Sequence, residues 1–526
     1  MSMLIKRFKL IKNFDFRYSK GNLFALKKTN HEIQRFLLKW IPAYAGMTML
    51  LVSSFVRAEL PTSITDALKR AGIPQSAVSI YVQAVDSTAP TLSLNADKSM
   101  NPASVMKLVT TTAALDLLTP AYRWKTEVYR DGNVVSDKPN NGVLQGNLII
   151  KGFGDPSFKA QEFWRMLMSL QQAGIKQING DFIIDKTVFA KSVGDRHALD
   201  DEAFDKEKWR AYNAEPSAFL VNGRNTSFKF IATDIGVNVS QEFELPEVQI
   251  INNMKLRNGA CGEWRSNFGY TVRQKEGCGN ANCNKNSAAV VTFSGTFSPD
   301  CGERYLELSV LDDEQYAFAT FKKLWSELGG KFNGKLKVQQ SPASAIKVLE
   351  QVSDPLGYVV RDINKWSNNL MARQLLLTLA IEKQSAPATE EKGAQVLKDW
   401  MASKNNDAKE LVIENGSGLS RTERISAEHL GALLVSAYHS PVMPELMASL
   451  PILAQDGTVK KRLNDSQAQG RAHLKTGSLD GVNAIAGYVL DAKNRRHVLV
   501  MVVNNAKAEQ SKKAQDALIE WTYNQP

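Results

Sequence analysis

Three short motifs that lie far apart along the chain constrain its fold most strongly, because one active site would have to gather all of them. In chain order they are Ser104-Val105-Met106-Lys107, Ser367-Asn368-Asn369 and Lys475-Thr476-Gly477. Each is short enough to arise by chance, but together and in this order they predict a serine nucleophile served by lysine bases, as in acyl-transferring enzymes. The chain must therefore bring its first and last parts together.

The segment between the first two motifs has a different pattern from its flanks. Short strand-like runs punctuated by Gly, Asn and Asp fill it: 147–151, 181–185, 227–232, 242–245, 248–252 and 288–293. We predict an α+β protein with an antiparallel sheet flanked by helices, in which the catalytic domain is split by a mostly β insertion of about two lobes. The predicted parts are a leader at 1–58, catalytic parts at 59–121 and 345–526, and the insertion at 122–344.

Outside the insertion, periodicity predicts the elements that would carry the motifs. A helix at 64–71 precedes a strand at 78–84 whose alternation indicates a half-buried strand. The helix that carries Ser104 has Asn101 as its expected N-cap and Pro102 at its first position. Further helices are expected at 355–366, 368–382, 390–402, 427–438 and 508–523, and strands at 473–479, 484–490 and 497–504.

The first 58 residues resemble an export signal rather than a folded segment. They carry eleven Lys/Arg and two Asp/Glu, a net charge of +9, so +11 minus +9 leaves only +2 for the rest of the chain. An apolar run from Met47 ends in Val56-Arg57-Ala58, which suits cleavage before Glu59. We expect a periplasmic protein; an uncleaved anchor and a later start codon remain alternatives. The near-neutral remainder argues against a nucleic-acid binder.

Four cysteines, Cys261, Cys278, Cys283 and Cys301, fall within one short stretch of the insertion. In an exported chain they predict two disulfides, and of the three pairings we favour the nested one, Cys261–Cys301 around Cys278–Cys283. A structural zinc site lacks the paired C-x-x-C spacing, and free thiols remain open if the chain is not exported. The six histidines show no metal spacing, and we expect no metal and no cofactor.

Ser104 and Lys107 lie three positions apart, so on a helix their side chains share a face. A lysine can deprotonate the serine if burial or a second cation, such as Lys475, disfavours its ammonium form. The N–H of Ser104, in the first helical turn, would be free to bind an oxyanion. A second Ser-x-x-Lys, Ser344 to Lys347, lies too close to the next motif and is interpreted as a chance match.

The other two motifs gain weight from their context. Ser367 lies between two predicted helices, where it would also be the N-cap of the second helix, and a loop there could project Ser367 and Asn369 into a cleft. Lys475 and Thr476 open a strand and could bind a carboxylate. The small Gly477 would let a substrate backbone approach closely.

With these motifs, the chain resembles the penicillin-binding D-alanyl-D-alanine carboxypeptidase/endopeptidase family with a large insertion, the penicillin-binding protein 4-like class C group, peptidase family S13. The resemblance covers residues 59–526 and extends to Gly154-Asp155-Pro156, residues 414–421, Asp456-Gly457-Thr458 and residues 475–479. Asn415 stands where family members usually carry Asp, which leaves the role of that position open.

The resemblance implies a set of roles. Ser104 would attack the peptide carbonyl with Lys107 as its base, Ser367 would pass a proton to the leaving amine, and Asn369 would position the groups. Lys475 and Thr476 would hold the substrate carboxylate beside Gly477, and the N–H groups of Ser104 and Ser478 would form the oxyanion hole. Asp155 and Arg361 would bind the charged end of a diaminopimelate stem.

The partners implied are peptidoglycan stem peptides and cross-links, and β-lactams that acylate Ser104 and leave slowly. We expect no nucleic-acid partner and at most a peripheral contact with the membrane. Whether the chain forms a homodimer stays open. Two alternatives remain: a β-lactamase, disfavoured by the insertion and by the lack of a Glu-x-x-Leu-Asn motif, and a non-catalytic wall-binding protein, disfavoured by the intact motifs.

Overall fold

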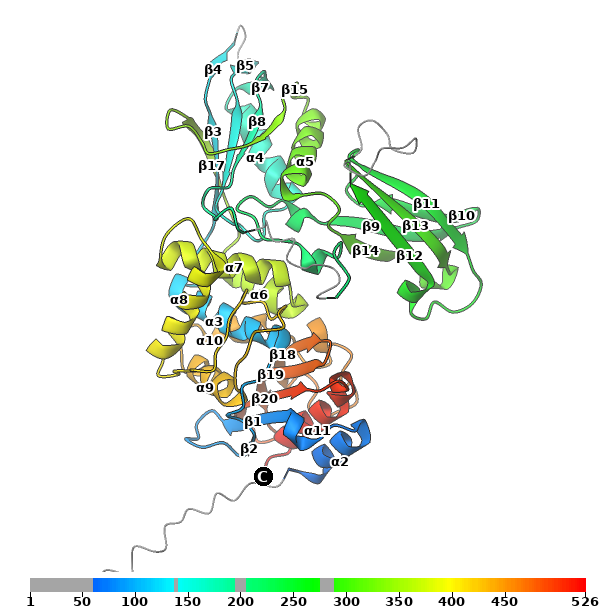
Figure 1. Cartoon of the computed structure of the whole chain (residues 1–526), viewed down its shortest axis with the longest axis vertical. Helices are drawn as coiled ribbons and strands as arrows, with labels where there is room; N and C mark the ends of the chain where they lie inside the picture. The colour runs from blue at the N-terminus through cyan, green and yellow to red at the C-terminus, as the bar shows by residue number, and fades with distance from the viewer. Residues whose placement is uncertain (1–59, 137–140, 194–204, 275–287) are drawn as a thin grey trace, which may run out of the picture. The chain divides into compact units, whose positions relative to one another are not determined.

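The computed structural model describes residues 60–136, 141–193, 205–274 and 288–526. One five-stranded antiparallel sheet joins the start of this part of the chain to its end (Figure 1). Its order is β18 (Ala472–Leu479), β19 (Val482–Leu490), β20 (Arg496–Asn504), β1 (Val78–Ala84) and β2 (Leu92–Leu94). The predicted union of the first and last segments is thus present, with β18 at one edge of the sheet.

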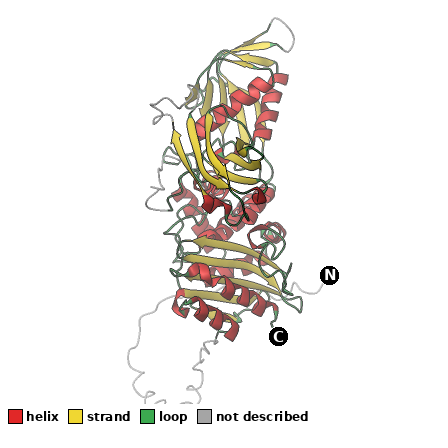
Figure 2. Cartoon of the chain, turned by 90° about the vertical axis from the view of Figure 1, so that its right-hand side faces the viewer, coloured by secondary structure: helices red, strands yellow, loops and turns green. Residues whose placement is uncertain are grey.

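Helices cover both faces of this sheet (Figure 2). One face packs on α2 (Thr62–Ala71) and α11 (Lys512–Tyr523), which share an apolar core with Ile80 and Val82. The other face packs on a cluster of helices, and Tyr81 of β1 belongs to the apolar core that the sheet and these helices share. The prediction of a half-buried β1 was therefore wrong: apart from its last residue the strand is buried on both faces.

The helical cluster contains six further helices from the described residues on either side of the insertion. They are α3 (Lys107–Leu118), α6 (Leu356–Trp366), α7 (Asn369–Lys383), α8 (Glu390–Ser403), α9 (Ala427–Tyr438) and α10 (Met443–Ser449). Helix α3 is buried around most of its circumference, since all residues from Lys107 to Leu115 are buried. A helix surrounded by protein in this way holds its side chains in fixed positions.

The insertion forms two regions with separate sheets (Figure 1). The first region has sheets ordered β16-β8-β6-β3-β17 and β15-β7-β5-β4, with bounds β3 Lys125–Arg130, β4 Asn133–Val135, β5 Gly142–Gln145, β6 Leu148–Gly152, β7 Ile175–Ile178, β8 Phe182–Asp185, β15 Lys331–Phe332, β16 Leu336–Val338 and β17 Ile346–Val352. The second has sheets β10-β9-β14 and β11-β13-β12, with bounds β9 Thr226–Thr233, β10 Gly236–Gln241, β11 Val248–Leu256, β12 Phe268–Gln274, β13 Ala289–Phe297 and β14 Arg304–Leu308.

Three details of the insertion differ from expectation. It holds two long helices, α4 (Ala160–Gln172) and α5 (Asp313–Glu327), which cover the first region's sheets and were not predicted. Residues 242–245 form a bend instead of a strand. Strand β17 pairs with β3, so the insertion's sheet continues past residue 344 to Val352.

Cys261 and Cys301 form a disulfide, which confirms this half of the favoured pairing. It ties the end of the β11 region to the turn before β14. Cys278 and Cys283 lie outside the described residues, as do the leader and its predicted cleavage site.

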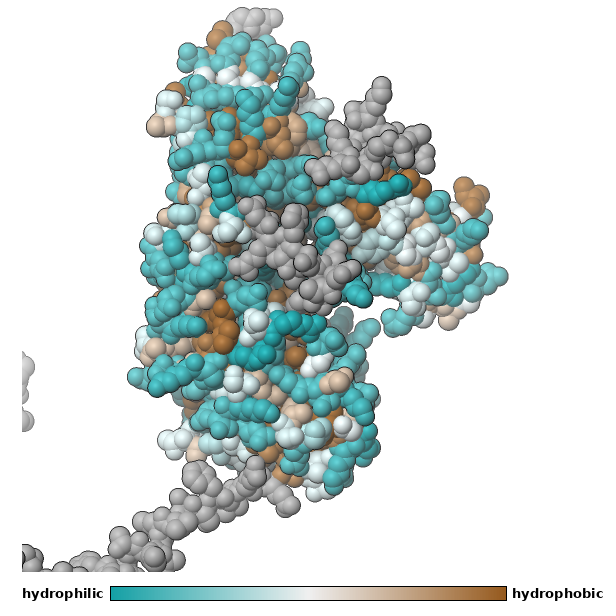
Figure 3. All heavy atoms as spheres, viewed as in Figure 1, coloured by the Kyte–Doolittle hydropathy of each residue, from teal (hydrophilic) through white to brown (hydrophobic). Residues whose placement is uncertain are grey.

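In the described ranges no helix is both long and apolar enough to cross a bilayer. On the face drawn in Figure 3, hydrophobic residues occur in small groups among hydrophilic ones.

Candidate active site

Ser104 lies on a short 3₁₀ turn, η2 (Ala103–Met106), that leads directly into α3. The predicted α-helix thus begins later than expected, at Lys107. The N-cap of the turn is Pro102 instead of the predicted Asn101, although the Asn101 Oδ1 atom accepts a hydrogen bond from the Ala103 N–H at 2.8 Å. Because Ser104 is only the second residue of the turn, its N–H has no acceptor within the turn.

The Lys107 ammonium lies against Ser104, as the spacing predicts. Its Nζ atom is 3.0 Å from Ser104 Oγ and 2.6 Å from Asn369 Oδ1, and it also donates to the Ser417 carbonyl. The side chain is fully buried. First and second motifs therefore meet at one nitrogen, with the carbonyl of a third segment completing its contacts.

Burial holds the pKa of the Lys107 ammonium well below its usual range. The positive charge of Lys475 lowers it further, while the Glu423 carboxylate opposes the shift. Burial also lowers the pKa of Lys475 to about 7. Both amines are therefore shifted toward the neutral form that a base requires.

Ser367 lies at the junction of α6 and α7 in a left-handed conformation, with φ of 58°. The predicted N-cap role for Ser367 was wrong: Asn368 caps α7 by accepting from the Met371 N–H at 3.0 Å, and Ser367 instead ends α6. The turn points the Ser367 hydroxyl to Lys475, whose Nζ donates to Ser367 Oγ at 2.9 Å. The second and third motifs thus also touch.

Lys475 belongs to the edge strand β18. Residues 451–453 cover the start of this strand, through the Leu474 N–H to the Pro451 carbonyl at 2.8 Å and the Leu453 N–H to the Ala472 carbonyl at 2.9 Å. From Lys475 onward, β18 pairs with β19 on one side and with no other described strand. An unpaired strand edge can bind an extended peptide through its main chain.

Two glycines let the Ser104 turn pack against its neighbours. A Cβ atom on Gly477 would lie 2.6 Å from the Pro102 carbonyl oxygen and 2.9 Å from Ser104 N. A Cβ atom on Gly418, whose φ is +80°, would lie 1.9 Å from the Ala103 carbonyl oxygen. The close approach made possible by Gly477 is thus to the serine turn itself, whereas the sequence suggested only an approach by substrate.

A buried carboxylate that sequence reasoning missed shapes the loop beside Lys107. Glu423 is fully buried, and its Oε1 atom accepts from the N–H groups of Glu414, Asn415 and Gly416 at 3.1, 3.0 and 2.8 Å. Its Oε2 atom has no hydrogen-bond partner in the described ranges. These bonds hold the turn that presents the Ser417 carbonyl to the lysine.

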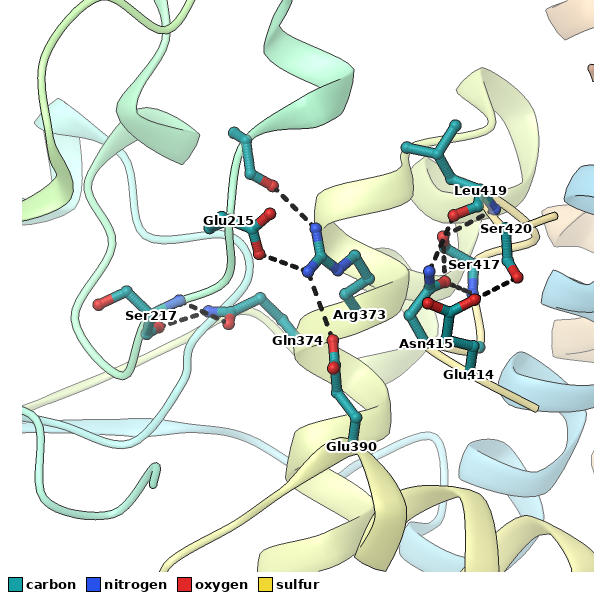
Figure 4. Close-up of polar contacts among 12 residues, drawn as sticks. Glu215, Ser217, Arg373, Gln374, Glu390, Glu414, Asn415, Ser417, Leu419 and Ser420 are labelled. Atoms are coloured by element: carbon teal, nitrogen blue, oxygen red, sulfur yellow. Dashed lines mark hydrogen bonds and ion pairs between the residues drawn. The ribbon is translucent and has the colours of Figure 1, made fainter. Parts of the chain in front are cut away.

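Asn415 closes the same loop (Figure 4). Its Oδ1 atom accepts from the N–H and hydroxyl of Ser417 at 3.0 and 2.6 Å, and its Nδ2 donates to the Leu419 carbonyl at 2.9 Å. An aspartate could accept the first two bonds but could not donate the third. Asn415 thus makes three hydrogen bonds within the turn, one of which needs its amide N–H group.

Helix α7, which begins at Asn369, contacts the insertion through Arg373 and Gln374 (Figure 4). The buried Arg373 forms ion pairs with Glu215 of the insertion and Glu390 of α8. Gln374 exchanges two hydrogen bonds with the Ser217 backbone, at 3.1 and 2.8 Å. In addition, Asn369 Nδ2 lies 3.5 Å from the Tyr212 carbonyl oxygen.

The remaining predicted residues lie in several places. Thr476 Oγ1 donates to Thr458 Oγ1 at 2.7 Å, and Ser478 is exposed on β18. Asp155 is buried and accepts from the N–H and hydroxyl of Ser157, and burial raises its pKa to about 6. Arg361 is exposed on α6, and no direct bond joins it to Asp155.

The second Ser-x-x-Lys sequence has a different environment. Lys347 lies on β17 and pairs with Glu127 at 3.0 Å and Glu350 at 2.6 Å. These ion pairs raise the pKa of the Lys347 ammonium, which favours the charged form and not a base. Within the described ranges, no cluster of three His, Cys, Asp or Glu side chains could hold a metal ion.

Comparison with known proteins identifies the family of the chain. The sequence profile of the D-Ala-D-Ala carboxypeptidase 3 (S13) family matches residues 60–525. The D-alanyl-D-alanine carboxypeptidase DacB of Haemophilus influenzae is 24% identical over 424 residues, which cover 78% of this chain and 81% of that protein. The D-alanyl-D-alanine carboxypeptidase of Actinomadura sp. (strain R39) is 27% identical over 398 residues, covering 74% and 70%.

Among solved structures, penicillin binding protein 4 (dacB) from Haemophilus influenzae has the same fold. Its crystal structure superposes with a TM-score of 0.70 at 21% sequence identity, over 88% of this chain and 99% of that one. The predicted fold class, a DD-peptidase-like α+β domain carrying a large insertion, is thereby confirmed.

Proposed function

This chain belongs to the D-Ala-D-Ala carboxypeptidase 3 (S13) family, and we propose that it hydrolyses D-alanyl peptides of peptidoglycan through an acyl-enzyme on Ser104. The observation that carries the proposal is the contact between Ser104 Oγ and a buried lysine amine at 3.0 Å. A serine hydroxyl needs such a neighbouring base to become a nucleophile.

The contacts of Lys107 favour a base whose lone pair faces the serine. Asn369 Oδ1 and the Ser417 carbonyl oxygen can accept hydrogen bonds but cannot donate them. A neutral amine has two N–H groups, and these two acceptors would occupy both. The remaining lone pair then faces Ser104 Oγ and takes its proton as the oxygen attacks the peptide carbonyl, forming the new C–O bond.

The surroundings of the serine suit the rest of the acylation step. The free N–H of Ser104, with that of Ser478 on β18, would stabilise the oxyanion. A substrate chain lying along the open part of β18 would bring its terminal carboxylate to Lys475 and Thr476. The Ser367 hydroxyl, held by Lys475, would pass a proton to the departing amine when the C–N bond breaks. Water then releases the acyl group.

A mass measurement after incubation with penicillin tests the nucleophile. We expect a single adduct on the peptide that contains Ser104, because a β-lactam carbonyl would acylate the same hydroxyl as a D-alanyl carbonyl. The variant Ser104→Ala should take up no penicillin while unfolding at an unchanged temperature. An adduct at Ser344, or a folded wild type that takes up none, would contradict the assignment.

The two lysines predict a bell-shaped pH dependence. Acylation should rise with pH as Lys107 loses its proton, and binding of a carboxylate should fall as Lys475 loses its proton above about pH 7. We expect kcat/KM for a peptide with a free terminal carboxylate to decline above pH 7. A terminal ester of the same peptide should lack this decline, and a common decline would assign it to another group.

We also propose that the enzyme cleaves peptide cross-links and that it is exported to the periplasm. The open edge of β18 gives room for a longer chain on either side of the scissile bond, which supports cleavage of cross-links as well as release of a terminal D-alanine. The basic leader with its apolar run supports export to the periplasm.

A further inference from the structure

The insertion contains a cavity of about 450 Å³ that the proposed chemistry does not use. It lies between the segment before η3 (Ala211–Asn213) and the turn η5 (Trp264–Asn267) with the start of β12. Among the described residues, its lining includes Trp209, Phe268 and Tyr270 together with several charged side chains. Aromatic rings and long cations dominate this set.

The described lining has one carboxylate, Glu207, which accepts from the Tyr270 hydroxyl at 3.2 Å, and four positive side chains, Lys206, Lys208, Arg210 and Arg265. In the part of the chain that the structure describes, none of the four cations forms an ion pair. Instead, Arg265 lies 5.5 Å from the Trp264 ring centroid and Arg210 lies 5.7 Å from that of Tyr212.

The positive charges of the Arg210 and Arg265 guanidinium groups repel each other. Burial lowers the pKa of Arg265, and the positive charge of Arg210 lowers it further. An anion between them would remove this repulsion and could accept charge-assisted hydrogen bonds from both. The planar forks of arginine suit a carboxylate in particular.

The segment around Trp209 and Arg210, which forms one wall of the cavity, is hydrogen-bonded to its neighbours and leads to the active site. The Trp209 carbonyl accepts from the Ser309 N–H at 2.8 Å, which ties the segment to the chain following β14. Two residues after Arg210, the Tyr212 carbonyl lies 3.5 Å from Asn369 Nδ2. Two residues of chain span at most about 7 Å, so one short segment joins the cavity to the proposed catalytic amide.

We propose that this cavity is a binding subsite for a free carboxylate that the peptide substrate carries upstream of the scissile bond. Trp209, Phe268 and Tyr270 would receive the apolar parts of the peptide, while Arg210 and Arg265 bind the carboxylate. The subsite rests on the proposed function, because it takes the part of the same substrate that extends away from Ser104.

The test compares two D-Ala-D-Ala peptides that differ only in one upstream carboxylate, free in one and a primary amide in the other. For the full chain with Arg265→Gln, we expect kcat/KM on the free carboxylate to fall at least about tenfold through KM, the loss of one charge-assisted bond. Activity on the amide and acylation by penicillin should stay unchanged. Arg265→Lys should recover part of the loss, since it keeps the charge.

Arg273→Gln is the matched control, because Arg273 is exposed on β12, the strand that directly follows the turn of Arg265, and is not among the residues that line the cavity. An equal loss on both peptides, no loss on either, or the same selective loss in the control would overturn the subsite. A wild type that hydrolyses neither peptide and takes up no penicillin would overturn the proposed function, and the subsite with it. Wild-type turnover of both peptides with no preference for the free carboxylate would overturn the subsite alone.

Discussion

Replacing Lys107 by methionine should reduce the rate of acylation by penicillin at least about a hundredfold, and by up to about ten thousandfold, the usual contribution of a general base. Methionine fills similar space but has no lone pair that can take the Ser104 proton. Burial holds the pKa of the Lys107 ammonium well below its usual range, which favours the neutral amine whose lone pair can take this proton. The second-order rate constant of adduct formation, followed by intact mass, measures the loss.

Lys347→Met provides the matched control, since it removes the lysine of the other Ser-x-x-Lys sequence. Lys347 pairs with Glu127 and Glu350 on β17, so acylation should be unchanged in this variant. Thermal unfolding of both variants separates a chemical defect from a folding defect. Wild-type acylation by the Lys107 variant would remove this residue from the mechanism and direct attention to Lys475 as the base.

Replacing Gly418 by alanine should impair acylation to a similar degree without changing any group that takes part in the chemistry. The added Cβ atom would lie 1.9 Å from the Ala103 carbonyl oxygen and 2.6 Å from Ser104 N, and both of these are backbone atoms. The serine turn or the loop must therefore shift, and overpacking of this kind costs about 1–3 kcal/mol of stability. A displacement of the Ser104 hydroxyl by about 1 Å can cost a hundredfold in rate.

Gly329→Ala separates the packing effect from the backbone effect. Gly329 has φ of +75°, close to the +80° of Gly418, but a Cβ atom there would meet nothing within 4 Å. This control should lose only the left-handed backbone preference, about 1–2 kcal/mol, and acylate at the wild-type rate. Equal acylation by the two variants would show that the loop can move away from the serine turn at no functional cost.

The features that sequence could predict are those with local signals. Five of the helices after residue 355 follow from their 3.6-residue periodicity, and α9 begins and ends where the pattern does, but the short α10 (Met443–Ser449) was not predicted. The spacing of Ser104 and Lys107 carries its own geometry, because residues three apart on a helical turn share a face. The order of the three motifs then requires the sheet that joins the first and last segments.

The features that escaped prediction depend on contacts between distant segments. Nothing local marks Glu423 as a buried acid, since its partners are the backbone N–H groups of a loop. The role of the Ser417 carbonyl depends on where the polypeptide turns, not on a side chain. Burial of β1 on both faces requires knowledge of α2 and α11, which the alternation within one strand cannot supply. Helix α4, by contrast, has a local signal that the prediction missed, because its buried apolar residues Phe163, Met166, Leu167 and Leu170 recur at helical spacing.

The ion pair between Arg373 and Glu215 has a consequence for anyone who would trim this protein to a minimal enzyme. Arg373 is buried and divides its charge between Glu390 of its own domain and Glu215 of the insertion. Deleting the insertion would strip one counter-ion from a buried guanidinium, a loss that typically costs about 3–5 kcal/mol. The same deletion would remove the contacts between the insertion and α7, the helix that begins at Asn369. The insertion thus stabilises α7, and we expect that the insertion and the domain containing α7 cannot be separated without loss of stability.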